Sequence, residues 1–177
     1  LRSAGGPVMS TPQLIRPSMQ YQRGFIDAAV EFLAEGDRPD WSFAALEDDF
    51  EAYIETIAAR ETEPLAGVVP ETVYWLVDGQ RYIGRGSVRH TLTTELMQHG
   101  GHISYEIRPY ARGRGYGHRL CALLLDEARA IGLVRVLITC DDDNQASIRV
   151  IEGCGGVLEN RIDTGRDALT RRYWVDL

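Results

Sequence analysis

The stretch with the clearest chemical potential is residues 107–117, which reads IRPYARGRGYG. Glycine stands at positions 113, 115 and 117, and glycine allows a backbone to turn and a bulky ligand to approach its amides. The stretch leads into a strongly helical segment, whose first turn leaves N–H groups without intrahelical partners and carries partial positive charge. Because Arg112 and Arg114 add two cations, the stretch predicts a site for a phosphate or a diphosphate.

Other common phosphate sites are excluded by the residues present. A dinucleotide fingerprint needs a third glycine where this chain has His118, and its acidic ribose partner would fall among the apolar residues 133–137. All 19 basic residues are arginine, which excludes a Walker A loop, a kinase-type ATP site and a pyridoxal Schiff base, since each needs a lysine. A purely structural glycine-rich turn is the remaining alternative.

The elements around this stretch follow from hydrophobic periodicity and turn signals. An apolar stripe predicts a long helix over 115–131, and the apolar run 134–139 is typical of a strand buried on both faces. Asp78-Gly79 predicts a hairpin between strands 72–77 and 81–90, in which Gly84 and Gly86 indicate a bulge or a close backbone approach. The other predicted elements are strands 13–16, 103–107, 157–163 and 169–175, helices 18–34 (capped by Ser18), 43–60 and 144–152, and one or two helical turns within 93–99.

This order predicts a mixed α/β domain with a helical crossover between the strands that begin at Ile103 and Val134. The length of 177 residues, 44% of them hydrophobic, fits one globular domain. We expect that domain to span 9–177 and residues 1–8 to be a remnant ahead of a native start at Met9. The longest apolar run is too short to cross a bilayer and no secretory signal is visible.

Cysteines and charge restrict the class of protein further. Three cysteines without metal-ligand spacing predict a reducing cytoplasm and no metal site. Residues 27–63 hold twelve acids and two arginines, while the rest of the chain is mildly basic. This distribution argues against a nucleic-acid partner and suits one anionic and one cationic ligand at different places. A solvated acidic helix surface would give the same pattern.

The glycine-rich stretch resembles a known signature. Arg112-x-x-Gly115-x-Gly117, between an apolar strand and a long helix, is similar to the acetyl-CoA signature of the GNAT superfamily of N-acetyltransferases. Asn144-x-x-Ser147, followed by Glu152, Gly155 and Gly156, resembles the second conserved block of that family. The resemblance covers the chain from Met9 onward. It implies an α/β acyltransferase fold whose central, mostly antiparallel sheet is splayed between the strands 103–107 and 134–139.

The resemblance also implies where acetyl-CoA binds. The pantetheine arm would pair with the backbone around Glu106 and Ile107, and Asn144 and Ser147 would lie on its far side. The diphosphate would be held by the guanidinium groups and amides of the loop, namely Arg112, Gly113, Arg114, Gly115, Tyr116 and Gly117. Small enzymes of this class are often dimers, so a homodimer is possible.

Catalysis in such enzymes is direct attack of an amine on the thioester, which needs alignment, proton removal and an oxyanion donor. The resemblance implies the Ile107 N–H as that donor, whereas Ile151 stands where many family members have a proton-donating tyrosine. We consider Glu106 and His90 as catalytic groups for the proton. Three other candidates for proton work are His102, Ser104 and Tyr105, with His102 expected to be structural, and we expect Tyr116 to pack on the cofactor.

The acceptor is predicted to be a primary amine on a small cationic molecule. Arg89-His90, Gly100-Gly101-His102 and Arg172-Tyr173-Trp174 are similar to a small bacterial branch that includes aminoglycoside acetyltransferases acting on kasugamycin. Carboxylates beside aromatic rings suit a polycationic amino sugar, and the candidate acceptor residues are Asp40, Trp41, Asp48, Asp49, Tyr74, Trp75, His90 and Asp142. The alternatives are acetylation of a protein or peptide and a non-catalytic acyl-CoA-binding sensor.

Overall fold

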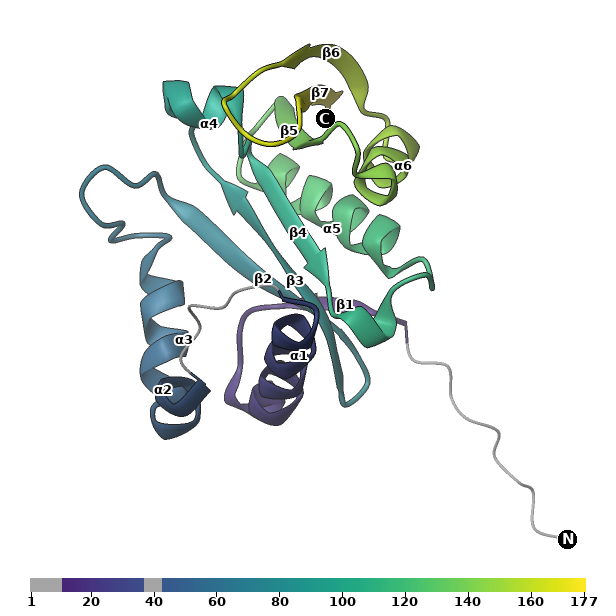
Figure 1. Ribbon diagram of the computed structural model, residues 1–177. Helices are drawn as coiled ribbons and strands as arrows, with labels where there is room; N and C mark the ends of the chain where they lie inside the picture. The colour runs from purple at the N-terminus through teal and green to yellow at the C-terminus, as the bar shows by residue number, and fades with distance from the viewer. Residues whose placement is uncertain (1–10, 37–42) are drawn as a thin grey trace, which may run out of the picture.

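The computed structural model describes residues 11–36 and 43–177. Its strands form two antiparallel sheets (Figure 1). The first sheet has the order β1-β2-β3-β4 and consists of β1 (Gln13–Ile15), β2 (Glu71–Asp78), β3 (Arg81–Arg89) and β4 (Ile103–Ile107). The second has the order β5-β7-β6 and consists of β5 (Arg135–Asp141), β6 (Val157–Ile162) and β7 (Thr170–Asp176).

Helices cover both faces of the first sheet, with α1 and α3 on one side and α5 on the other (Figure 1). The α-helices are α1 (Gln22–Ala34), α2 (Phe43–Asp48), α3 (Phe50–Ala59), α4 (Thr94–Gln98), α5 (Tyr116–Ala130) and α6 (Gln145–Gly153), and the 3-10 turns are η1 (Met19–Tyr21) and η2 (Pro109–Ala111). None of the described helices is both long and apolar enough to cross a membrane.

Two boundaries differ from the predicted helices because side chains cap the backbone. Ser18 accepts a hydrogen bond from the Gln20 N–H and begins η1, so the α-helix starts four residues later. The predicted helix 43–60 is interrupted at Asp49, whose carboxylate accepts a hydrogen bond from the Ala52 N–H and begins α3. Aspartate is favoured at this position, because its carboxylate accepts a hydrogen bond from an amide that has no partner within the helix.

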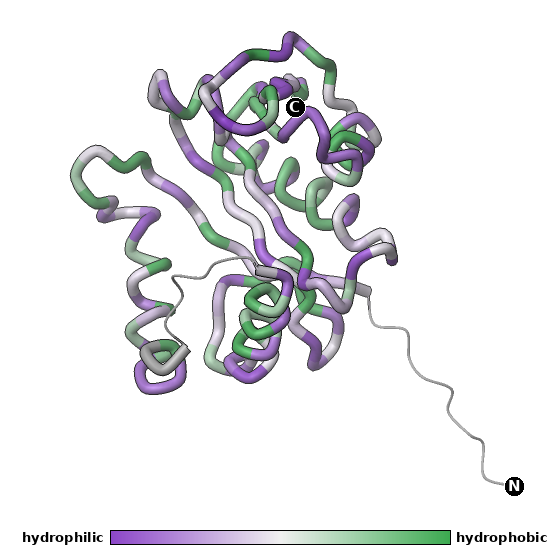
Figure 2. Tube along the Cα trace, in the orientation of Figure 1, coloured by the Kyte–Doolittle hydropathy of each residue, from purple (hydrophilic) through white to green (hydrophobic). Residues whose placement is uncertain are grey.

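The core consists of two clusters, one on each face of the first sheet. Leu76, Val88 and Ile103 pack against Leu120 and Leu124 of α5. The opposite cluster is aromatic and contains Tyr21, Phe25, Phe50, Trp75 and Tyr82. Figure 2 shows hydrophobic segments in the central strands and along the helices that cover them.

The glycines of β3 behave as the sequence predicts. Tyr82 pairs with Val77 and Gly84 with Leu76, so Ile83 is the extra residue of a β-bulge. A Cβ at Gly84 would lie 2.3 Å from the Glu106 carbonyl oxygen, and one at Gly86 would lie 2.4 Å from Leu124 Cδ1. Both positions therefore need glycine so that β4 and α5 can approach β3.

The two sheets meet at the start of β4 and then diverge. The His102 N–H donates to the Leu137 carbonyl at 2.7 Å, and the Leu137 N–H donates to His102 Nδ1 at 2.9 Å. Gly101, at φ +62°, allows this contact, because a Cβ there would lie 2.4 Å from the Leu137 carbonyl oxygen. Beyond it, β4 and β5 belong to separate sheets, which is the splay that the sequence resemblance implies.

Candidate active site

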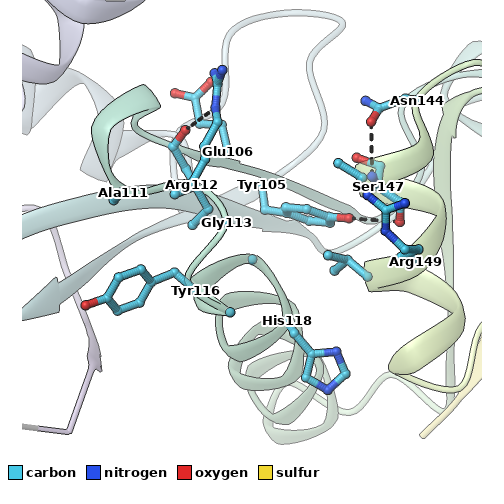
Figure 3. A pocket seen from close by; sticks show the side chains of 15 residues that line it. Tyr105, Glu106, Ala111, Arg112, Gly113, Tyr116, His118, Asn144, Ser147 and Arg149 are labelled. Carbon is cyan, nitrogen blue, oxygen red and sulfur yellow. Dashed lines mark hydrogen bonds between the residues drawn. The ribbon is translucent and has the colours of Figure 1, made fainter.

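A cavity of about 690 Å³ opens at this splay (Figure 3). Its size lies within the roughly 300–1,000 Å³ of typical ligand pockets. Its walls come from β4, the loop before α5, the first turn of α5, and α6, and they are formed by Tyr105, Glu106, Ile107, Ala111, Arg112, Gly113, Gly115, Tyr116, Gly117, His118, Asn144, Ala146, Ser147, Arg149 and Val150.

One wall is the backbone of β4. Hydrogen-bonded pairs alternate along an antiparallel ladder, and the bonds from Arg89 N–H to His102 and from Arg108 N–H to Ile83 place β4 in that register. The main-chain groups of Glu106 therefore face β3, opposite Arg85. Those of Tyr105 and Ile107 face the gap, so of the two residues predicted to pair with the pantetheine arm through their backbone, Ile107 faces the cavity side and Glu106 does not.

The second wall is the loop that ends at the N-terminus of α5. Gly113 and Gly115 have φ values of +75° and +81°, with nothing within 4 Å of an added Cβ, so glycine is needed here for backbone conformation. Gly115 is the N-cap residue and supplies no side-chain cap. The first-turn amides of the 15-residue helix are thus available to an anion. The helix dipole adds partial positive charge at the same place.

The arginines of this loop fix its shape. Arg108, nearly buried, forms an ion pair with Glu31 of α1, and Glu31 also accepts from the Tyr110 N–H at 3.1 Å. Arg112 donates to the Ile107 carbonyl at 3.1 Å and to Glu35 at 2.8 Å. Arg112 therefore braces the loop while also lining the cavity, and its predicted contact with the diphosphate stays a prediction.

The two remaining loop side chains have partners of their own. Arg114 lies over the Tyr110 ring at 4.8 Å and is not part of the cavity wall. Tyr116 does line the cavity, and its hydroxyl donates to Asp78 at 2.8 Å, a hydrogen bond that raises its pKa. The loop thus offers an anion its amides more than its side chains.

The third wall is the start of α6. The Asn144 side chain accepts from the Ser147 N–H at 3.0 Å and caps the helix, so both predicted residues reach the cavity. Arg149, which no sequence motif indicated, adds a cation to this wall. Helical spacing indicates its position, because residues three apart lie on the same face of a helix and Ala146, three residues before it, also lines the cavity.

A second, smaller pocket of about 230 Å³ lies on the same face of the first sheet as α1 and α3, on the part that these helices do not cover. It shares Tyr105 and Glu106 with the larger cavity. The strand register brings its wall together, because Arg85 pairs with Glu106, Ser87 with Ser104 and Glu71 with Arg89. A group bound here would therefore lie next to the larger cavity, at the residues that the two pockets share. The sequence analysis did not identify Glu71, Arg60, Arg85 or Ser87 as members of a site.

Two predicted acceptor residues belong to the protein core instead. Trp75 is fully buried, with its ring stacked on Phe25 at 5.0 Å. Tyr74 points to the other face of the sheet, where its hydroxyl donates to Glu127 of α5 at 2.8 Å. Packing in the two core clusters, on opposite sides of β2, therefore accounts for both aromatic side chains.

The predicted acidic acceptor residues also have other roles. Asp49 caps α3, and Asp48 is exposed at the end of α2. Asp142 is held by Arg171 at 2.5 Å and Arg161 at 3.2 Å, away from both pockets. Asp40 and Trp41 lie outside the described residues.

The residues predicted to transfer a proton lie on different faces of the first sheet. Glu106 lines both pockets, with its carboxylate 2.7 Å from Arg85 Nε. His90 lies near the end of β3 on the opposite face, 2.8 Å from Thr72 Oγ1, and lines neither pocket, so the structure does not support its predicted roles. Ser104 contacts Ser87 at 2.8 Å, and Ile151 is a buried core residue.

His102 is structural, as the sequence predicts. Burial, with a smaller contribution from Arg89, lowers its pKa to about 4, so the ring is neutral and Nδ1 can accept the Leu137 N–H. The unfolded chain then binds a proton more readily than the folded chain between pH 6.5 and 4. The contribution of this bond to the free energy of unfolding is therefore complete above pH 6.5 and is lost as the pH falls toward 4.

We expect His102→Asn, which keeps an acceptor atom but does not titrate, to flatten the fall in unfolding free energy between pH 7 and 4.5. The side chain is only half-buried, so solvent screening limits the difference to about 1 kcal/mol. Urea unfolding at the two pH values measures it. An equal pH dependence in both proteins would contradict the assignment.

A cavity in a splayed sheet, beside a helix N-terminus that no side chain caps, suits an extended ligand with an anionic end, such as an acyl-CoA. A family comparison agrees, since residues 17–157 match the acetyltransferase (GNAT) domain. The chain belongs to this family and is therefore an acetyl-CoA-dependent N-acetyltransferase.

Solved structures share the fold at low sequence identity. RimL, an α-N-acetyltransferase of a ribosomal protein in complex with coenzyme A, has a TM-score of 0.71 and 16% identity, with 97% of each chain covered. The microcin self-immunity acetyltransferase MccE, with acetyl-CoA and AMP, gives 0.68 and 16% identity over 100% of this chain and 98% of its own. The spermidine N-acetyltransferase of Vibrio cholerae, with coenzyme A and spermine, gives 0.61 and 17% identity over 93% of this chain and 95% of its own. No curated protein sequence matches significantly.

Proposed function

We propose that the protein transfers an acetyl group from acetyl-CoA to a primary amine of a small molecule held in the second pocket. The observation that carries the proposal is the shared wall, because Tyr105 and Glu106 belong to both the 690 Å³ cavity and the 230 Å³ pocket. A thioester in the first cavity and an amine in the second would meet beside these two residues, where the two pockets adjoin. Acetyl-CoA supplies the activated acetyl group.

The diphosphate would bind the amides of Gly113, Gly115, Tyr116 and Gly117, and the pantetheine arm would pair with the gap-facing backbone of β4. Ser147 and Asn144 would close the far side. The main-chain amides and the helix dipole supply the positive potential, and Arg112 holds the loop in the required shape.

Glu106 would first accept a proton from the ammonium form of the acceptor, directly or through water. The neutral nitrogen then bonds to the thioester carbonyl carbon, with the Ile107 N–H, which faces the gap, donating to the developing oxyanion. As the carbon–sulfur bond breaks, the nitrogen loses its second proton and the sulfur gains one. Tyr105, whose hydroxyl is protonated because burial raises its pKa, would relay that proton, giving its own to the sulfur and recovering one from the nitrogen through water.

The finer prediction, a cationic amino sugar such as kasugamycin, has less support among the described residues. Most of its acidic and aromatic candidates cap helices, fill the core or pair with arginine. The fold also occurs in acetyltransferases of a ribosomal protein and of spermidine. We therefore propose a small amine as the acceptor, and the experiment below also includes peptides and aminoglycosides.

The test is release of free thiol when the protein is mixed with acetyl-CoA and an amine panel that contains amino acids, polyamines, aminoglycosides and short peptides. We expect amine-dependent release with the acetylated amine as product. Tight acetyl-CoA binding without transfer to any amine would instead identify an acyl-CoA sensor. Transfer to peptides alone would contradict the small-molecule acceptor.

A further inference from the structure

The charges of the second pocket select a different acceptor from the one that overall composition predicts. The described residues of its wall include three arginines and two glutamates, so the wall carries one net positive charge. The chain as a whole carries a formal charge of −7. This pocket is thus a basic site in an acidic protein.

The positive excess lies at the end remote from Glu106. At the near end, Arg85 and Glu106 pair one to one at 2.7 Å. At the far end, the single carboxylate of Glu71 lies between Arg60 at 3.6 Å and Arg89 at 3.5 Å, and it also accepts from Ser87 Oγ at 2.6 Å. Two guanidinium groups therefore share one carboxylate.

The same end is open to a ligand. The Arg60 side chain, from the C-terminal end of α3, is 48% exposed, while that of Glu71 is only 12% exposed. Glu71 is held in place, whereas Arg60 makes a long ion pair that it can exchange. The fork of a guanidinium group matches the geometry of a carboxylate or a phosphate.

We propose that the acceptor is an amine that carries an anionic group, which binds the exposed guanidinium group of Arg60 beside Glu71, while the amine lies near Glu106. This inference rests on the proposed function and names its substrate class. Arg85 and Arg89 are four residues apart on β3, so the two ends are separated by about 13 Å of strand. A separation of this order places the acid several bonds from the amine.

The pocket volume supports a small acceptor. At about 230 Å³ it is smaller than typical pockets for drug-sized ligands, which hold roughly 300–1,000 Å³. A short amino acid fits this space, and a polycation would meet the guanidinium groups at the far end. The like charges would oppose its binding.

The experiment compares amines of equal length that differ only in their acidic group. 4-Aminobutyrate, 5-aminovalerate and 6-aminohexanoate are each paired with their carboxamides, and 3-aminopropylphosphonate distinguishes a phosphate-like from a carboxylate group. We expect kcat/KM to be at least tenfold higher for an acid than for its amide. In Arg60→Gln that ratio should fall toward one, while Arg129→Gln, on the exposed surface of α5, keeps it.

Equal kcat/KM for acids and amides would overturn the inference while leaving the acetyltransferase proposal intact, as would a preference for spermidine or an aminoglycoside. Loss of all amine-dependent thiol release, with every amine tried, would instead overturn the proposed function. A ratio unchanged in Arg60→Gln, alongside a strong preference for acids, would contradict the assignment to this end of the pocket.

Discussion

Replacing Gly115 by aspartate should weaken acetyl-CoA binding at least a hundredfold. The carboxylate would stand at the N-cap of α5, where it would both accept the first-turn amides and repel the diphosphate. A hundredfold change corresponds to about 2.8 kcal/mol of binding free energy. Isothermal titration calorimetry with acetyl-CoA measures the effect.

Two controls separate charge from backbone strain. Gly115→Asn has nearly the same shape and tolerates the φ of +81°, so it should weaken binding less than tenfold. Gly165→Asp places the same charge at another open glycine of positive φ, far from the cavity, and should leave the affinity unchanged. Equal affinities for the aspartate and wild-type proteins at position 115 would contradict the phosphate-loop assignment.

Replacing Glu106 by glutamine should lower kcat about a hundredfold at pH 7 and leave the affinity for acetyl-CoA nearly unchanged. General base catalysis is worth roughly 10²–10⁴-fold, and Glu106 is the carboxylate common to both pockets. Steady-state kinetics across pH 6–10 test this role. The loss should shrink at high pH, where the amine in solution is already deprotonated.

A role limited to the ion pair with Arg85 would produce a different profile. The rate would then fall by the same factor at every pH, and Arg85→Gln would reproduce the loss. Glu55→Gln, on the exposed side of α3, serves as the matched control and should behave as wild type.

The fold was largely predictable because its signals are local. The Asp78-Gly79 turn, the stripe of α5 and the apolar run of β5 each lie within one segment, and the structure confirms them. The interruption at Asp49 was not predicted, because an aspartate on a continuous apolar pattern is compatible with either a cap or an exposed helical face.

The cofactor wall was predictable for a related reason. The residues of the glycine-rich loop are contiguous, and the splay follows from the family resemblance. The role of Arg112 was not predictable, since it depends on Glu35, 77 residues away. Residue type alone cannot tell a ligand-binding guanidinium from a bracing one.

The acceptor site was the least predictable part. The acids of residues 27–63 suggested a cationic ligand, but Glu31 pairs with Arg108 and Glu61 with Arg16. The pocket that forms is basic because β3 and the end of α3 bring three arginines to one face. Such long-range pairing is set by strand register, which charge counts do not contain.

The central claim is that the amides after β4 hold the coenzyme diphosphate in the splay between the sheets. Hydrogen–deuterium exchange with and without acetyl-CoA tests it amide by amide. We predict slower exchange at residues 113–118 and at the gap-facing amides of Tyr105 and Ile107. Unchanged exchange at 113–118, with protection confined to β6 and β7 or to the β2–β3 turn, would contradict the claim.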